Sequence, residues 1–465
     1  MRRGVWIAIA SAAAVTIGTA FVSQSAVLPV AAFSALSVLA WFLPRLFAGV
    51  GLLLVVLAAT LRATFPSLNL GFLDEIVVVV AVVVLTTRRL VCRQLPVIPS
   101  WALWFLGFVA VGLLSSLLNV VPNNIVFDGG FLAVKAMLLG VAFAQIDWKP
   151  GDLQPFIAGG GILTVIIFVT SMINLIAPDL WTSLVLGRNE QFEGEFGLPA
   201  LIGPFEYPAT LGRFCALLAI AILAYRLTVR ATWRSVTLLA MASISALGSF
   251  RVKTVVSLIG SAALVAGLSL KRMPPKLLLA LIIGGAALAV PIGLFVWADI
   301  VKYIVNVSAR SLLTFGAVDV AARNFPLGAG FGRYGSYTAA VYYSPEYIRL
   351  GFNSVYGMRS TLGGGRFLTD TQWPAILGET GWLGAMLFAG GLVHIAITFL
   401  RKSAARTEPL VAWLRITGLG WLLILVIESI AAPVFTSPPA YPLPFVAAGI
   451  YFSLLAGHSQ STQEK

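Results

Sequence analysis

The chain has 465 residues, of which 59% are hydrophobic and only 11% are charged, and its mean hydropathy is +0.95. Soluble domains carry roughly 25% charged residues, so this composition excludes a water-soluble cytoplasmic enzyme, a disordered protein and a secreted disulfide scaffold. The 31 Lys and Arg residues exceed the 18 Asp and Glu residues and give a net charge of +13. In a membrane protein, basic residues gather in cytoplasmic loops, so we interpret this charge by position and not as a sign of nucleic-acid binding.

Apolar segments recur along the whole chain, and about 20 apolar residues suffice for one membrane-spanning helix. Fourteen candidates lie near residues 4–22, 26–43, 47–63, 71–86, 101–120, 129–146, 155–176, 205–225, 235–249, 254–270, 277–297, 381–400, 410–432 and 442–456. Arg2 and Arg3 would suit a cleavable signal, but the many spans that follow favour a retained first helix. The sequence therefore predicts an all-α, polytopic integral membrane protein with about 12–14 transmembrane helices and one long extracytoplasmic loop that contains interfacial helices.

The basic residues fall on alternate connections between these segments. With the N-terminus inside, the cytoplasmic connections include Arg45, Arg88, Arg89 and Arg93. The short external connections at 64–67, 122–124 and 433–439 contain no Lys or Arg. This distribution follows the positive-inside rule and predicts that both termini are cytoplasmic.

Two connections assigned to the outside are long. Residues 177–204 carry the acids Asp179, Glu190, Glu193 and Glu195 against the single base Arg188. Residues 298–372, called the long loop below, form a stretch of 75 residues. Loops of this length are commonly functional, so we expect the chemistry there. The predicted regions are N-terminal transmembrane helices with the acidic external loop (1–204), central transmembrane helices (205–297), an extracytoplasmic catalytic loop (298–372) and C-terminal transmembrane helices (373–465).

The long loop is rich in arginine and tyrosine. Its bases are Lys302, Arg310, Arg323, Arg333, Arg349, Arg359 and Arg366, and its acids are Asp299, Asp319, Glu346 and Asp370. A guanidinium group grips phosphate oxygens through two hydrogen bonds, which favours an anion site for a phosphate or diphosphate; the alternative is a solvated amphipathic loop on lipid headgroups. The tyrosines suit either an interfacial aromatic belt or stacking on sugar rings. They are Tyr334, Tyr337, Tyr342, Tyr343, Tyr347 and Tyr356.

The stretch 308–324 of the long loop predicts a helix. Ser308 or Ser311 can cap its start, and the sequence Phe325-Pro326-Leu327-Gly328 ends it. On an external loop, such a helix would lie along the membrane interface or fold over a cavity.

The sequence from Gly330 to Gly335 matches G-x-G-x-x-G, but no strand precedes it and no βαβ unit fits around it. A dinucleotide site is therefore rejected, and the glycines are interpreted as tight turns or as places of close backbone approach. His394 and His458 are the only histidines. We therefore expect no histidine-based metal site, no Ser-His-Asp triad and no cofactor.

The chain returns to the membrane through residues 369–384, which contain two acids. Asp370 and Glu379 would lie near a helix start, where carboxylates are stabilised. Asp370 either caps the helix or acts as a general base that faces the arginine-rich loop. Glu379 is interpreted as structural, held close by Gly378 and Gly381.

Several of these segments together resemble the O-antigen ligase and polysaccharide polymerase superfamily of bacterial membrane glycosyltransferases. The segment 324–332 (NFPLGAGFG) is similar to the family's Pro-hydrophobic-Gly-x-Gly motif after an interfacial helix that starts at an Arg, here Arg310. Residues 369–384 resemble its helix start with Glu-x-Gly-x-x-Gly, 248–251 its Ser-Arg hairpin and 203–208 its earlier external motif. Ligases of the family carry His where this chain has Asp370, so the resemblance is to the polymerase branch that builds capsular polysaccharide or exopolysaccharide.

The resemblance implies a metal-independent glycosyltransferase in the bacterial cytoplasmic membrane. The donor would be a glycan on a polyprenyl diphosphate, the acceptor a second lipid-linked glycan, and a protein that controls chain length a further partner. The implied catalytic residues are Asp370, Arg310 and Arg333, with Asp370 as the base and arginines stabilising the leaving diphosphate. The implied substrate-binding residues are Arg213, Arg251, Arg366, Glu206, Tyr334 and Tyr337, and Glu195 is a reserve carboxylate.

A second class of function also fits the composition. Many secondary transporters have twelve or fourteen helices, and a flippase for a lipid-linked or anionic substrate would also use external arginines. Transporters usually show repeated halves, whereas here the long loop lies only in the second half of the chain.

Overall fold

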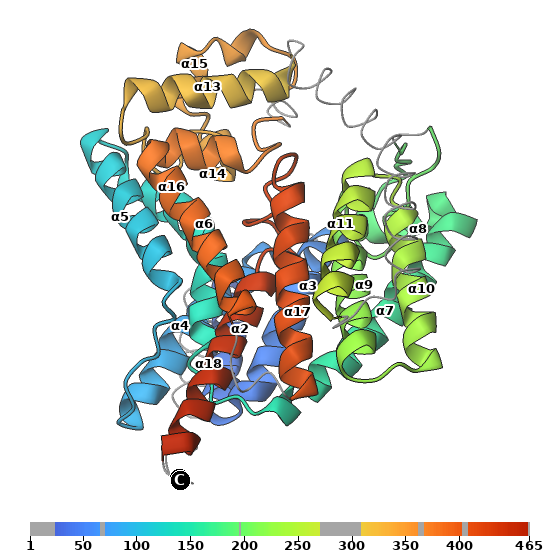
Figure 1. The fold of residues 1–465 in the computed structure, drawn as a ribbon. Coiled ribbons are helices and arrows are strands. Elements are labelled where there is room, and N and C mark those ends of the chain that lie inside the picture. Colours follow the sequence, from blue (N-terminus) through green and yellow to red (C-terminus); the bar gives the residue numbers. More distant parts are fainter. Residues whose placement is uncertain are drawn as a thin grey trace.

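The computed structural model describes residues 24–65, 70–194, 197–269, 308–360, 367–401 and 408–463. Within them it contains eight helices that are long and apolar enough to cross a membrane, together with four shorter apolar helices. These account for twelve of the predicted spans. The predicted spans near 4–22 and 277–297 lie outside the described residues. The protein is therefore an all-α, multi-pass membrane protein, as predicted (Figure 1).

Most consecutive spanning helices are joined by short connections, and prolines mark many of their starts. They are α2 (Gln24–Phe42), α3 (Pro44–Thr64), α4 (Leu73–Val91), α5 (Ala102–Leu118), α6 (Asn123–Phe143), α7 (Gln154–Ile176), α9 (Pro208–Thr228), α10 (Trp233–Leu247), α11 (Val252–Ser269), α16 (Trp373–Leu400), α17 (Pro409–Glu428) and α18 (Leu443–Gln463). Proline suits the first helical turn because the amide that it lacks would have no intrahelical partner there. Helix α6 begins six residues earlier than predicted because Pro122 stands directly before it.

The acidic connection 177–204 also contains structure that the sequence did not predict. Its first part forms the short helix α8 (Pro178–Leu186), which ends at Gly187 in the left-handed conformation. Leu180 and Leu184 on α8 are exposed, whereas Thr182 and Val185 are buried.

The two ends of the helix bundle differ in what they carry. At one end α13 (Ala309–Arg323) lies across the spanning helices, and the C-terminus lies at the opposite end (Figure 1). We call the first the loop end. At the opposite end the predicted cytoplasmic arginines meet acids, with Arg45 Nε 2.9 Å from Asp152 Oδ2 and Arg89 Nη2 3.4 Å from Asp147 Oδ1.

The long loop folds into a small helical layer with its own core. Helix α13 begins with the predicted cap, in which the Ser308 hydroxyl accepts from the Ser311 amide, and it ends at Asn324. The short helices α14 (Tyr337–Val341) and α15 (Pro345–Arg349) follow. A buried cluster joins them, and its larger members are Leu313, Val320, Tyr334, Tyr347, Phe352, Met358 and Leu368.

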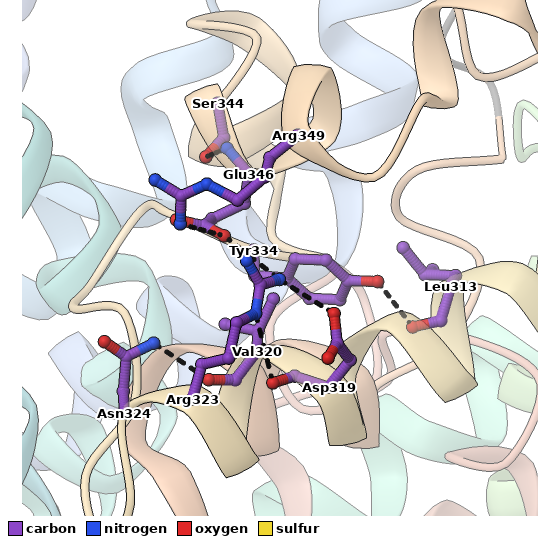
Figure 2. Close-up of polar contacts among 9 residues, drawn as sticks. All are labelled: Leu313, Asp319, Val320, Arg323, Asn324, Tyr334, Ser344, Glu346 and Arg349. Atoms are coloured by element: carbon purple, nitrogen blue, oxygen red, sulfur yellow. Dashed lines mark hydrogen bonds and ion pairs between the residues drawn. The ribbon is translucent and has the colours of Figure 1, made fainter.

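Charged residues of the long loop neutralise one another beside this core. Arg323 Nη2 lies 2.9 Å from Asp319 Oδ2 and 3.6 Å from Glu346 Oε2. Arg349 Nη1 contacts Glu346 Oε1 from the other side at 2.9 Å, as Figure 2 shows. Two of the predicted phosphate-gripping arginines are therefore engaged in ion pairs within the loop itself.

Candidate functional site

A cavity of about 1050 Å³ opens at the loop end of the bundle. Its wall combines residues of α3, α4, α6, α9, α11 and α16 with the 431–438 connection and residues 335–337 of the long loop. Many of the lining side chains are charged or polar, although they lie among spanning helices. Ionisable residues inside a membrane protein are costly and commonly mark substrate or ion pathways, so this cavity is the candidate functional site.

Asp370 lines the cavity directly before α16. Arg310, in the first turn of α13, donates to Asp370 Oδ2 from Nη2 at 2.6 Å and from Nε at 3.2 Å. Both hydrogen bonds end on the same oxygen, so no bond from a described residue occupies Oδ1. This ion pair connects the start of α13 with the end of the long loop, and the Asp370 side chain is 34% exposed.

Hydrogen bonds to the segment that follows α17 fix the backbone next to Asp370. The Gln372 amide donates to the Ser429 carbonyl at 3.2 Å, and its side-chain oxygen accepts from the Phe435 amide at 3.2 Å. The Trp373 indole donates to the Ser429 hydroxyl at 2.9 Å. The backbone that carries the Asp370 carboxylate is therefore held in place by these hydrogen bonds.

Arg213 of α9 also lines the cavity, and it has a buried partner. Its Nε lies 2.6 Å from Oε2 of Glu428 in α17, and both side chains are almost fully buried. The hydroxyl of Thr254 lies 3.3 Å from the other Glu428 oxygen. An arginine in an apolar segment needs either a partner or a polar cavity, and here the structure supplies both.

Lys253, which the sequence analysis did not single out, lines the same cavity in the first turn of α11. Its ammonium donates to the Ala431 carbonyl at 2.9 Å. Among the described residues no carboxylate forms an ion pair with it, in contrast to Arg213 and Arg310.

A second group of charges lines the cavity on α4 and α6. Lys135 Nζ lies 2.6 Å from Asp74 Oδ2, with both residues less than 5% exposed, and it stands 4.9 Å from the centre of the Tyr441 ring. The neighbouring Glu75 also lines the cavity. All three charged residues, Asp74, Glu75 and Lys135, lie inside predicted apolar segments. A charge inside an apolar segment was therefore the sequence signal that could have indicated them as site residues.

Two further predicted substrate-binding residues reach the cavity. Glu206 lines it and lies 3.4 Å from Arg62 of α3. Tyr337, at the start of α14, lines it with a side chain that is 66% exposed. The reserve carboxylate Glu195 lies outside the described residues.

The remaining predicted site residues are not brought to the cavity. Arg333 and Arg251 are absent from its described lining. Arg366 lies outside the described residues. Tyr334 is fully buried in the long-loop core, where its hydroxyl donates to the Leu313 carbonyl at 2.8 Å (Figure 2). An aromatic ring that is packed on all sides cannot stack on a sugar. The structure therefore gives Tyr334 a place in the core of the long loop and not the predicted place in substrate binding.

Burial also keeps the phenol groups of the two core tyrosines, Tyr334 and Tyr347, in their neutral form. It raises the pKa of both the Tyr334 and Tyr347 phenols well above the usual range, so both stay protonated. Tyr347 accepts from the Gly335 amide at 2.8 Å. Of the six tyrosines offered for sugar stacking, Tyr337 and Tyr356 are the most exposed.

The glycine-rich stretch 330–335 surrounds the carboxylate of Glu379. The Tyr334 amide lies 3.3 Å and the Ser336 hydroxyl 2.5 Å from Glu379 Oε1, and the amides of Gly332 and Arg333 also bond to this carboxylate. Gly330, Gly332 and Gly335 all have positive φ, which lets consecutive amides converge on one group. The group that this motif holds is thus the Glu379 side chain of the protein itself.

Helix α16 is broken where this stretch meets it. Gly381 has φ 65° and ψ −168°, which frees backbone groups of the helix. The Gly378 and Glu379 carbonyls accept from the Ala329 and Gly330 amides at 2.8 and 2.9 Å, and the Leu383 amide donates to the Pro326 carbonyl at 3.3 Å. The 326–330 stretch therefore replaces the lost helical bonds and attaches the long loop to the helix that follows Asp370.

Among the described residues no group of three or more His, Cys, Asp or Glu side chains is arranged to hold a metal ion. Within the part of the chain that the structure describes, the site contains several ion pairs, among them Arg310–Asp370 and Arg213–Glu428, and the cation Lys253, which has no carboxylate within ion-pair distance. The fold and site together define the protein as a multi-pass α-helical membrane protein with a charged cavity at its loop end. Comparison with models of known protein families and with curated proteins finds no match for this chain.

Proposed function

We propose that the protein is a membrane glycosyltransferase that elongates or transfers glycans linked to a polyprenyl diphosphate. The observation that supports this most is the placement of Asp370 on the wall of the cavity, held by Arg310 through one oxygen only. A general base must be positioned within reach of its substrate and keep a free lone pair, and Oδ1 meets the second condition.

The reaction requires one proton acceptor and one stabilised leaving group. Asp370 takes the proton from an acceptor hydroxyl, whose oxygen forms a bond to the anomeric carbon of the donor while the bond from that carbon to the diphosphate oxygen breaks. The proton ends on Asp370 and the electron pair on the polyprenyl diphosphate. Fixed cationic side chains can stabilise such a leaving group without a metal ion.

The distribution of charge favours a loop end on the extracytoplasmic side of the bacterial cytoplasmic membrane. The predicted cytoplasmic bases Arg45 and Arg89 lie together at the opposite end of the bundle, where they pair with acids. Both termini are then cytoplasmic, and the cavity opens where lipid-linked glycans are assembled outside the cell.

The length profile of surface polysaccharide tests this proposal in cells. An Asp370→Asn strain should lose long polymer while the amount of membrane protein stays at the wild-type level. Asp319→Asn is the matched control, because Asp319 belongs to the same loop but pairs with Arg323 away from the cavity. Long polymer that persists unchanged in the Asp370→Asn strain would remove Asp370 as the base.

A transporter or flippase is the second candidate. It is favoured by the Asp74–Lys135 pair, which lines the cavity within spanning helices, as ion-coupling groups of transporters do. Translocation of a fluorescent lipid-linked glycan in proteoliposomes would support it. Under this candidate Asp74→Asn should stop translocation and Asp370→Asn should leave it intact.

A further inference from the structure

On the α9–α11 side of the cavity, one cation, Lys253, has no carboxylate within ion-pair distance among the described residues. Arg213 is neutralised by Glu428 at 2.6 Å, and Arg310 by Asp370 at 2.6 Å. Lys253 has no carboxylate partner among the described residues and makes one hydrogen bond, to the Ala431 carbonyl. An ammonium group has three donors, so two remain for a ligand.

The position of Lys253 in its helix makes this charge costly. It lies in the first turn of α11, a helix of 18 residues, where the helix dipole is positive and disfavours a cation. It also lies inside a candidate membrane span. An anion in the cavity would relieve both penalties, since it would pair with the ammonium and face the positive helix end.

The lining around Lys253 suits a phosphate-bearing ligand. Gln372 and Thr436 line the same cavity and add neutral polar groups to its wall. Asp370, the proposed base, lines it too, so an anion held by Lys253 shares one enclosed space with the reacting hydroxyl.

We infer that Lys253 is the anion-binding residue of the cavity and that it holds the diphosphate of the lipid-linked donor. The family resemblance implied this task for Arg251, Arg310, Arg333 and Arg366, with Arg213 as a further possibility. Arg213 and Arg310 already pair with carboxylates, Arg251 and Arg333 are absent from the described lining, and Arg366 lies outside the described residues. The diphosphate identity rests on the proposed glycosyltransferase function, whereas binding of an anion at Lys253 does not.

Calorimetric titration of the detergent-purified full chain with inorganic pyrophosphate tests the anion site. Wild-type protein should bind, Lys253→Gln should bind at least tenfold more weakly, and Lys253→Arg should keep most of the affinity because the charge remains. Lys149→Gln is the matched control, since Lys149 is exposed between α6 and α7 at the opposite end of the bundle. Gel filtration and thermal unfolding verify that each variant is folded. If Lys253→Gln fails to fold, Lys253→Met, which also removes the charge, takes its place with the same expected loss of affinity.

Three results would overturn the inference: no pyrophosphate binding to the wild type, equal affinity in Lys253→Gln, or an equal loss in Lys149→Gln. Competition then identifies the source of the phosphate. Polyprenyl phosphate should displace pyrophosphate more strongly than phosphatidylglycerol does, and equal displacement would contradict a site for the lipid carrier. Asp370→Asn should still bind pyrophosphate. If the wild type binds pyrophosphate through Lys253 but never elongates glycan, the proposed glycosyltransferase function is overturned and the anion site at Lys253 is not.

Discussion

Asp370 differs from the other paired acids of the long loop in where its side chain lies. Three arginines of the long loop, Arg310, Arg323 and Arg349, pair with acids of the same loop. Of these acids only Asp370 lines the cavity, and it remains partly exposed. These three arginines therefore help to hold the loop together, and of their ion pairs only Arg310–Asp370 includes a residue that lines the cavity.

The tyrosines of the long loop allow a residue-scale prediction. Tyr347→Phe leaves the buried Gly335 amide without an acceptor and should cost about 1–3 kcal/mol of stability. Tyr334→Phe removes a donor to a carbonyl within α13 and should cost about 1 kcal/mol or less. Thermal unfolding in detergent should rank the variants in this order. The exposed Tyr356→Phe serves as the control, and an unfolding temperature for Tyr347→Phe equal to that of this control would refute the assignment.

At the scale of elements, the break in α16 joins two motifs that are distant in the sequence. The proline- and glycine-rich stretch 326–330 supplies partners for the helix backbone around Gly381, and the next glycines surround Glu379. The two motifs are thus halves of one structural unit, which positions the long loop over the cavity.

Substitution of Gly381 tests this unit. Gly381 has φ 65°, and an added Cβ would meet the Leu327 carbonyl, so Gly381→Ala should destabilise the protein by more than 2 kcal/mol, on the order of a steric clash combined with left-handed strain. Gly267→Ala in α11 is the control, since a Cβ there meets nothing within 4 Å. Hydrogen exchange should show loss of protection at the Ala329 and Gly330 amides in Gly381→Ala alone. Unchanged protection there would show that the break is not held by the 326–330 stretch.

The sequence was sufficient for elements whose signals are local. Apolar length predicts the spanning helices, and Ser308 together with Phe325-Pro326 predicts both ends of α13. The sequence was not sufficient for pairings between distant residues. Nothing local connects Arg213 with Glu428, 215 positions away, or separates the buried Tyr334 from the exposed Tyr337. Lys253 was missed because a lone lysine at a helix start has meaning only once the cavity beside it is known.

At the scale of the whole molecule, the cavity at the loop end of the bundle has two differently charged sides. The α9–α11 side carries Lys253 and the Arg213–Glu428 pair, and the α4–α6 side carries the Asp74–Lys135 pair with Glu75. A ligand with an anionic group and a hydroxyl-rich body would find complementary partners on the two sides. This arrangement suits a lipid-linked glycan better than a small anion alone.

The Asp74–Lys135 pair gives a prediction at this scale. Asp74→Leu or Lys135→Leu alone leaves an uncompensated charge among spanning helices and should cost about 3–5 kcal/mol. The double variant should be less destabilised than either single variant, because no charge remains unpaired. Unfolding of the three variants in detergent measures this, and additive losses in the double variant would show that the two charges are not coupled.

The central claim is that Asp370 acts as the base in glycan transfer, and elongation of a synthetic polyprenyl-diphosphate glycan by purified protein in detergent tests it most directly. No membrane gradient exists in this assay, so transport alone cannot produce a longer glycan. The account predicts elongation by the wild type and a loss of about 10²–10⁴-fold in rate for Asp370→Asn, with Asp319→Asn close to wild type. Absence of elongation by folded wild-type protein, or an Asp370→Asn rate equal to that of the wild type, would contradict it.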